Sequence, residues 1–139
     1  MGEGVAVERS EALPVAEGED PWTDEETAEV REELESEVAR LERAIRTAEA
    51  GLADLFKESD GAGRDAADVG SSNFERDQEL SLVQNSKDML EQAVSALKAF
   101  DNGRYGWCEV CGRPIGKDRL QVFPRATMCV TCKQREERR

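Results

Sequence analysis

The sequence predicts a mainly α-helical protein: a long antiparallel two-helix coiled-coil hairpin, then a small four-cysteine metal-binding module and a short C-terminal helix. Two apolar series with heptad spacing, separated by a short connection rich in Gly and Asp, predict the hairpin. The four cysteines, all near the C-terminus, predict the module. Hydrophobic residues make up only 38% of the 139 residues and charged residues 36%. This composition suits an elongated helical protein better than one large core.

Residues 1–20 are rich in Glu, Gly and Ala and show no apolar period, so we expect a disordered acidic tail. A partner-binding or autoinhibitory arm is the functional alternative. The net charge of −12 disfavours binding to the phosphates of DNA. The sequence has neither a run of about 18 apolar residues nor a signal-peptide pattern. We therefore expect a cytoplasmic protein, without membrane contact, whose cysteines are reduced.

The coiled-coil hairpin is predicted over residues 21–104. Its first helix should run from about residue 24 to residue 59, because Thr23-Asp24-Glu25-Glu26 fits a capping box. At 1.5 Å per residue, such a helix is roughly 50 Å long. Its apolar residues alternate in steps of four and three, a period of 3.5 residues. They are Leu34, Val38, Leu41, Ile45, Ala48, Leu52 and Leu55.

A second capping box, Ser72-Asn73-Phe74-Glu75, predicts that the second helix begins there and ends at Asp101-Asn102-Gly103. Its series has the same spacing, with Lys87 as its one polar member. The apolar members are Leu80, Val83, Leu90, Val94 and Leu97. Because the connection, the tip at about residues 60–71, is short, we expect the helices to fold back within one monomer. Pairing between two chains is the alternative.

Residues 105–139 should form a zinc-ribbon or zinc-finger module followed by the C-terminal helix. Cys108, Cys111, Cys129 and Cys132 have the C-x2-C-x17-C-x2-C spacing of a four-thiolate Zn²⁺ site. A complete tetrahedron leaves no open position for water, so the expected zinc ion is structural. Two disulfides or an iron site are the alternatives. Nearby basic residues would offset the negative charge of the site or face a partner.

Asp65 and Asp68 are spaced so that they lie on one side of a helical turn at the tip. Capping of the second helix is the simple interpretation. Alternatively, these acids pair with basic residues in a partner's cleft, or share a Mg²⁺ there. The chain has no His and its thiols are assigned to metal, so we predict no enzyme activity and no catalytic residues.

Three features together resemble the DksA/TraR family of C4-type zinc-finger regulators of bacterial RNA polymerase. These are the cysteine spacing, the segment from Tyr105 to Gly112, and the pair Asp65 and Asp68, placed as far before Cys108 as the family's tip motif. The resemblance implies a regulator that inserts its coiled-coil tip into the polymerase secondary channel. There it would change the stability of the promoter open complex, without binding DNA.

The resemblance also assigns roles to residues. Asp65 and Asp68 would be the effector residues, and Gly70 stands where the family's tip motif has Ala. The zinc module would stay at the channel rim. Its candidate rim contacts are Arg119, Arg125 and Lys133.

Guanosine tetraphosphate binding is not predicted. At the positions aligned with the family's basic contacts, the chain has Gln92 and Phe123, although Lys133 is retained. Three other functions remain open: a Gre-like factor that aids transcript cleavage, a zinc-stabilised coiled-coil adaptor, and a thiol redox sensor.

Overall fold

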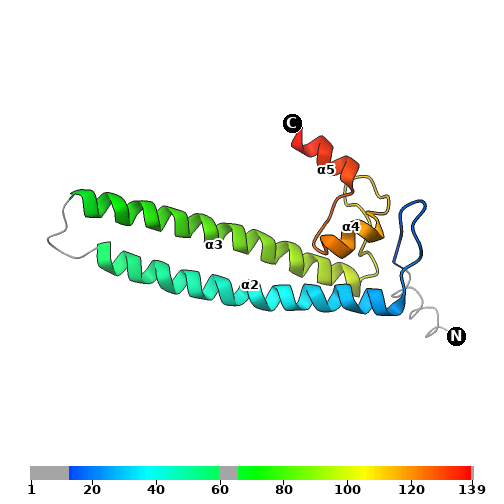
Figure 1. The fold of residues 1–139 in the computed structure, drawn as a ribbon, viewed down its shortest axis with the longest axis horizontal. Helices are drawn as coiled ribbons and strands as arrows, with labels where there is room; N and C mark the ends of the chain where they lie inside the picture. The colour runs from blue at the N-terminus through cyan, green and yellow to red at the C-terminus, as the bar shows by residue number, and fades with distance from the viewer. Residues whose placement is uncertain (1–12, 60–65, 139) are drawn as a thin grey trace. The chain divides into compact units, whose positions relative to one another are not determined.

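A computed structural model describes residues 13–59 and 66–138. The predicted mainly α-helical hairpin with a cysteine module is confirmed (Figure 1). The helices are α2 (Asp24–Ser59), α3 (Ala66–Asp101), α4 (Lys117–Val122) and α5 (Val130–Glu137). The described residues contain no β-strand beyond one isolated bridge between Trp107 and Pro114. No helix in these ranges has the apolar length that crossing a bilayer requires.

The chain divides into two compact units. One joins Met1–Val38 to Glu91–Arg139, and the other is Ala39–Leu90. Each unit contains an antiparallel stretch of α2 against α3. In the first unit an ion pair of 3.1 Å joins Arg31 to Asp101, and in the second one of 3.2 Å joins Lys87 to Glu49.

The start of α2 is the capping box that the sequence predicts. The Thr23 N–H donates to Glu26 Oε1 at 2.9 Å, and the Glu26 N–H donates to Thr23 Oγ1 at 3.1 Å. These two bonds satisfy backbone donors that have no partner inside the helix. The helix then runs from Asp24 to Ser59, the range predicted from its apolar period.

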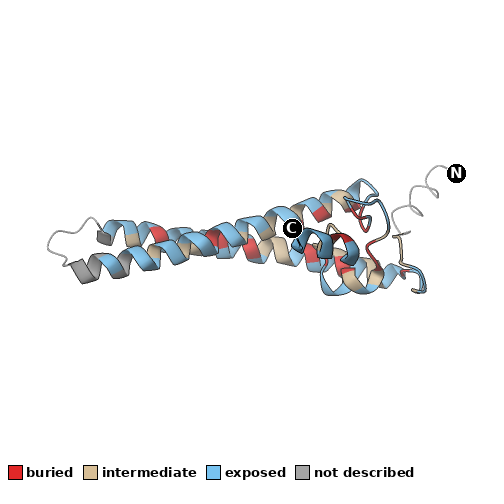
Figure 2. Cartoon of the chain, turned by 90° about the horizontal axis from the view of Figure 1, so that it is seen from above, coloured by how far each residue is buried: buried red, intermediate tan, exposed pale blue. Residues whose placement is uncertain are grey.

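The apolar series of α2 is confirmed as the buried face of the helix. In Figure 2 buried positions recur at intervals along the long helices. Leu34, at 0% exposed, and Leu41, at 2%, are its most buried members. The remaining members of the series are buried or half-buried. The 3.5-residue period therefore identifies the correct face of this helix along its length.

The predicted start of α3 is wrong. The helix begins at Ala66, and Ser72 and Glu75 lie inside it. The physical reason is that a spacing of three residues also occurs within any continuous helix, where it places two residues on one side. A capping-box pattern therefore fits a helix interior as well as a helix start.

The buried face of α3 also differs from the predicted series. Val83, Leu90, Val94 and Leu97 are buried or half-buried as predicted, but Leu80 is 46% exposed. At three points the buried face also includes a small or polar residue, one position before the predicted member of the series. These are Glu79, Ser86 and Ala93. Lys87, the predicted polar member, is exposed and pairs with Glu49. A series chosen for large apolar residues misses such positions.

The core of the first unit gathers residues from α2, α3 and the cysteine module. Leu34 and Leu120 are fully buried in it. Phe100, at the end of α3, stacks on Tyr105 with 4.1 Å between ring centroids. These contacts attach the loop that carries the first two cysteines to the end of α3.

The prediction of a disordered tail is wrong for residues 13–20. Leu13 and Val15 pack against the core of the first unit, and the Trp22 indole N–H donates to the Pro14 carbonyl at 3.1 Å. The physical reason is that these residues find partners in the distant cysteine module, which local composition does not reveal. Residues 1–12 lie outside the described residues.

Candidate metal centre

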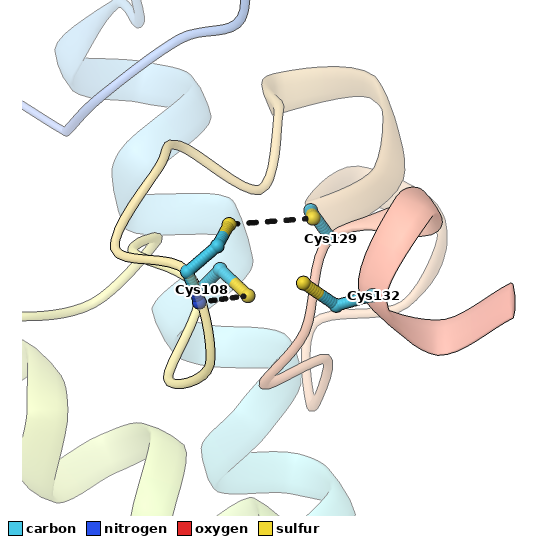
Figure 3. A group of neighbouring side chains, drawn as sticks. Cys108, Cys129 and Cys132 are labelled. Atoms are coloured by element: carbon cyan, nitrogen blue, oxygen red, sulfur yellow. Dashed lines mark hydrogen bonds between the residues drawn. The ribbon is translucent and has the colours of Figure 1, made fainter. Parts of the chain in front are cut away.

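Two segments bring the four predicted cysteines together. Cys108 and Cys111 lie in the loop after α3, Cys129 is the N-cap of α5, and Cys132 lies in the first turn of α5. In Figure 3 the sulfurs of Cys108, Cys129 and Cys132 point toward a common centre. All four Sγ atoms lie within 4.8 Å of one another.

The sulfur spacing fits a tetrahedral zinc ion. A Zn–S bond of about 2.3 Å requires sulfur atoms about 3.8 Å apart along each edge of the tetrahedron. The Sγ atoms of Cys111 and Cys129 are 3.8 Å apart. Four thiolates would complete the coordination, which suits a structural metal and leaves no site for a reacting water.

A short hairpin holds the first cysteine pair. The Cys108 N–H donates to the Arg113 carbonyl at 2.8 Å, and the Ile115 N–H donates to the Gly106 carbonyl at 2.8 Å. Gly112 turns the chain with a φ of +76°, a conformation that favours glycine. We call residues 106–116 the zinc hairpin.

The thiols of the cluster differ in acidity. Burial would raise the pKa of the Cys108 thiol, but the backbone N–H groups of Cys111, Cys129 and Val110 outweigh it and lower the pKa to about 6. Burial, reinforced by the neighbouring thiols, raises the pKa of Cys132 to about 12. Four thiolates at this spacing repel one another, so a bound cation is needed to hold all four ionised.

Polar contacts attach the module to both long helices within the first unit. The Tyr105 hydroxyl donates to the Pro124 carbonyl at 2.9 Å, and burial raises the pKa of Tyr105. Arg125 forms an ion pair with Glu37 of α2 and donates to Gln92 Oε1 of α3 at 2.8 Å. The sequence offered no sign of this bridge, because its three members are far apart in the chain.

The three candidate rim residues lie around one surface groove of about 630 Å³. Arg119, Arg125 and Lys133 all line it, as do Gln92 and Phe123. The Arg119 Nε–H donates to the Met128 carbonyl at 3.2 Å, so this guanidinium also supports the loop before α5. The groove therefore brings together the positions singled out by the resemblance.

The predicted tip residues are only partly within the described structure. Asp65 lies outside the described residues, and Asp68 lies in the first turn of α3. Gly70 is exposed in the same helix, and a Cβ there would meet no atom within 4 Å. The roles assigned to these residues stay predictions.

The cysteine module and the chain as a whole match known proteins. Residues 103–138 match the family described as the prokaryotic dksA/traR C4-type zinc finger. The chain is 33% identical over 135 residues to the RNA polymerase-binding transcription factor DksA of Caulobacter vibrioides, covering 97% of this chain and 92% of that protein. The chain belongs to the DksA/TraR family. As in this C4-type family, its four cysteines form the site of one structural zinc ion.

Other DksA/TraR proteins support the assignment. The DksA of Haemophilus influenzae is 32% identical over 69 residues, covering 50% of this chain and 48% of that protein. The structure of transcription factor DksA2 from Pseudomonas aeruginosa matches with a TM-score of 0.67 and 31% identity, covering 83% and 85% of the two chains. These relatives are named as transcription factors and not as enzymes.

Proposed function

We propose that this protein binds bacterial RNA polymerase and regulates transcription initiation without binding DNA. It would do so by inserting the tip of its helical hairpin into the secondary channel and changing the stability of the promoter open complex. The observation that carries the proposal is the likeness, over 97% of the chain, to a protein named as an RNA polymerase-binding transcription factor. The net charge of −12 supports the absence of DNA binding.

The geometry of the helices suits insertion into a channel. α2 and α3 have 36 residues each, and two packed helices measure about 20 Å across. Residues 60–65 join them, so the connection and the first turn of α3 carry Asp65 and Asp68. We infer that these carboxylates act on the polymerase active centre, where they would meet basic side chains or a bound Mg²⁺.

The zinc module would hold the hairpin at the entrance of the channel. Arg119, Arg125 and Lys133 line one groove and are our candidates for contacts with the channel rim. Because Arg125 also binds Glu37 and Gln92, it would transmit a fixed orientation from the helices to the module. The zinc ion supplies a rigid crosslink between the two cysteine pairs.

The positions aligned with the family's nucleotide contacts do not carry the full set of basic side chains that bind guanosine tetraphosphate. Among the three aligned positions only Lys133 is basic, while Gln92 is neutral and Phe123 is 56% exposed and apolar. We therefore propose that the protein acts on polymerase without this nucleotide. We also propose that it acts as a monomer, because α2 and α3 of one chain pair with each other.

The test is to compare Asp68→Asn with a matched control, Asp77→Asn, which removes an exposed carboxylate from the same helix. We expect both variants to bind core polymerase in a pulldown as the parent does. Asp68→Asn should lose the effect on open-complex lifetime, and Asp77→Asn should keep it. Full activity of Asp68→Asn would overturn the tip assignment. Cleavage of RNA in stalled elongation complexes would replace the proposal with the Gre-like function.

A further inference from the structure

Residues 13–22, which we call the strap, lie against both arms of the zinc hairpin. On the first arm, a Cβ placed on Gly106 would meet Pro14 Cγ and Cδ at 3.0 Å. On the second arm, a Cβ placed on Gly116 would meet Ala16 and Glu19 at 3.6 Å. Both glycines have positive φ, +93° and +114°. The absence of side chains at these two positions lets the strap approach the hairpin backbone closely.

Glu19 is the main polar anchor of the strap. Its Oε1 accepts hydrogen bonds from the N–H groups of Ala16 and Lys117, both at 2.7 Å, and its Oε2 accepts one from the Asp118 N–H at 3.0 Å. Burial would raise the pKa of Glu19, but these backbone donors outweigh it and hold the pKa below its usual value. One carboxylate therefore closes the turn in the strap and binds the chain just after the zinc hairpin.

Trp22 joins the two ends of the strap. Its indole N–H donates to the Pro14 carbonyl at 3.1 Å, and the residue is only 8% exposed in the core of the first unit. The Lys117 ammonium lies 6.0 Å from the centre of this ring and 3.4 Å from the Pro21 carbonyl. The Trp22 side chain thus closes the strap on itself, and the Glu19 side chain attaches it to Lys117 and Asp118.

The contacts lie close to the metal ligands along the chain. Gly106 precedes Cys108 by two residues, and Gly116 follows Cys111 by five. Two backbone hydrogen bonds, from Cys108 to Arg113 and from Ile115 to Gly106, join the arms between these points. A segment that presses on both arms resists their separation, and separation of the arms would move the first cysteine pair away from the second.

We propose that the strap is a clamp that slows opening of the zinc centre, with Glu19 as its positioning residue. The clamp concerns metal retention and does not depend on polymerase binding. Loss of the strap contacts frees the zinc hairpin to open, so zinc leaves the four thiolates faster. The N-terminal segment thereby controls the lifetime of a metal site whose ligands begin about ninety residues later in the chain.

The experiment measures zinc transfer from the full-length zinc-loaded protein to a chromogenic chelator. Glu19→Gln is compared with Glu17→Gln, which makes the same charge change at an exposed residue of the strap. We expect Glu19→Gln to transfer zinc roughly five to ten times faster than the parent, because a carboxylate bound to three N–H groups is lost. Glu17→Gln should match the parent. Equal rates for the two variants would overturn the clamp.

A second comparison separates the clamp from general destabilisation. Leu34→Ala weakens the core of the first unit without touching the strap hydrogen bonds. At denaturant concentrations that give equal unfolding free energies, Glu19→Gln should still release zinc faster than Leu34→Ala. Hydrogen exchange should also show faster exchange at the Lys117 and Asp118 amides in Glu19→Gln alone. If Leu34→Ala releases zinc as fast, or if these amides keep their protection, the clamp is excluded.

Discussion

The ammonium of Lys117 lies 2.7 Å from Glu26 Oε1, so the first turn of α4 is bound to the first turn of α2. The same carboxylate oxygen accepts the Thr23 N–H of the capping box. Glu26 thus caps one helix locally and joins it to a segment about ninety residues away in sequence. The hydrogen bond to Lys117 and the backbone hydrogen bond from Thr23 lower the pKa of Glu26 to about 2.

This lowered pKa predicts how stability depends on pH. The contribution of Glu26 should be fully present above about pH 4.5, its unfolded pKa, and should be lost as the pH falls toward about 2, the folded pKa. Urea unfolding of the parent and of Glu26→Gln should therefore differ most at neutral pH and converge in acid. Glu29→Gln, at an exposed position of the same helix, is the control. A difference that grows with acidity would contradict the prediction.

Removal of zinc should loosen the cysteine module while most of the helix remains. The module has few apolar residues of its own, so metal binding supplies much of its folding energy. We expect chelation, or Cys132→Ser, to abolish the near-ultraviolet circular dichroism signal of the stacked Phe100 and Tyr105. Far-ultraviolet helix signal should largely persist, since α2 and α3 contribute most of it. An unchanged near-ultraviolet spectrum after metal removal would argue against a structural metal.

Leu34→Ala should destabilise the protein strongly. The side chain is 0% exposed in the core of the first unit, and a Leu-to-Ala change at such a site costs about 2–5 kcal/mol. Leu82→Ala is the natural comparison, because Leu82 is 58% exposed and its loss should cost less than about 0.5 kcal/mol. Equilibrium unfolding in urea measures both values. Similar costs for the two variants would contradict this assignment of the core.

Arg125 should couple energetically to Glu37. Both side chains are largely buried, at 26% and 13% exposed. Removal of the guanidinium therefore takes an ion-pair partner from the Glu37 carboxylate in a site that water reaches poorly. We expect Arg125→Ala to lower the free energy of unfolding by about 1–2 kcal/mol. A double-mutant cycle with Glu37→Gln should give a clear coupling energy. Arg135→Ala, an exposed residue of α5, should have little effect, and a vanishing coupling energy would exclude the bridge.

Local signals in the sequence predicted much of this structure. The capping box at Thr23 and Glu26 predicted where α2 begins, because both of its hydrogen bonds form within one turn. The spacing of the cysteines predicted the metal centre, since each pair needs only a tight turn to bring its sulfurs together. In both cases the interaction that determines the structure is short in sequence.

The features that the sequence did not predict depend on distant partners. In the sequence, Glu19 is indistinguishable from the other acidic residues of the tail. Its role depends on the amides of Lys117 and Asp118, which are distant in the sequence and close in the fold. Ala93 is 0% exposed, yet alanine gives a weak apolar signal. One available hint was Trp22, a large aromatic residue that closely follows the apolar run Leu13-Pro14-Val15-Ala16. Such a residue rarely stays in water, and it should have suggested that the neighbouring chain is packed.

The polar residues on the inner face of α3 have a consequence for how firmly the two long helices hold each other. Glu79 and Ser86 occupy inward positions where a strong coiled coil would have large apolar side chains, and Val83 between them is the buried apolar residue. Around Ala93 and Phe100 the contacts are denser. Local opening costs the least free energy where it exposes few apolar groups to water. We therefore expect α2 and α3 to separate locally more readily around Glu79 and Ser86 than around Ala93 and Phe100.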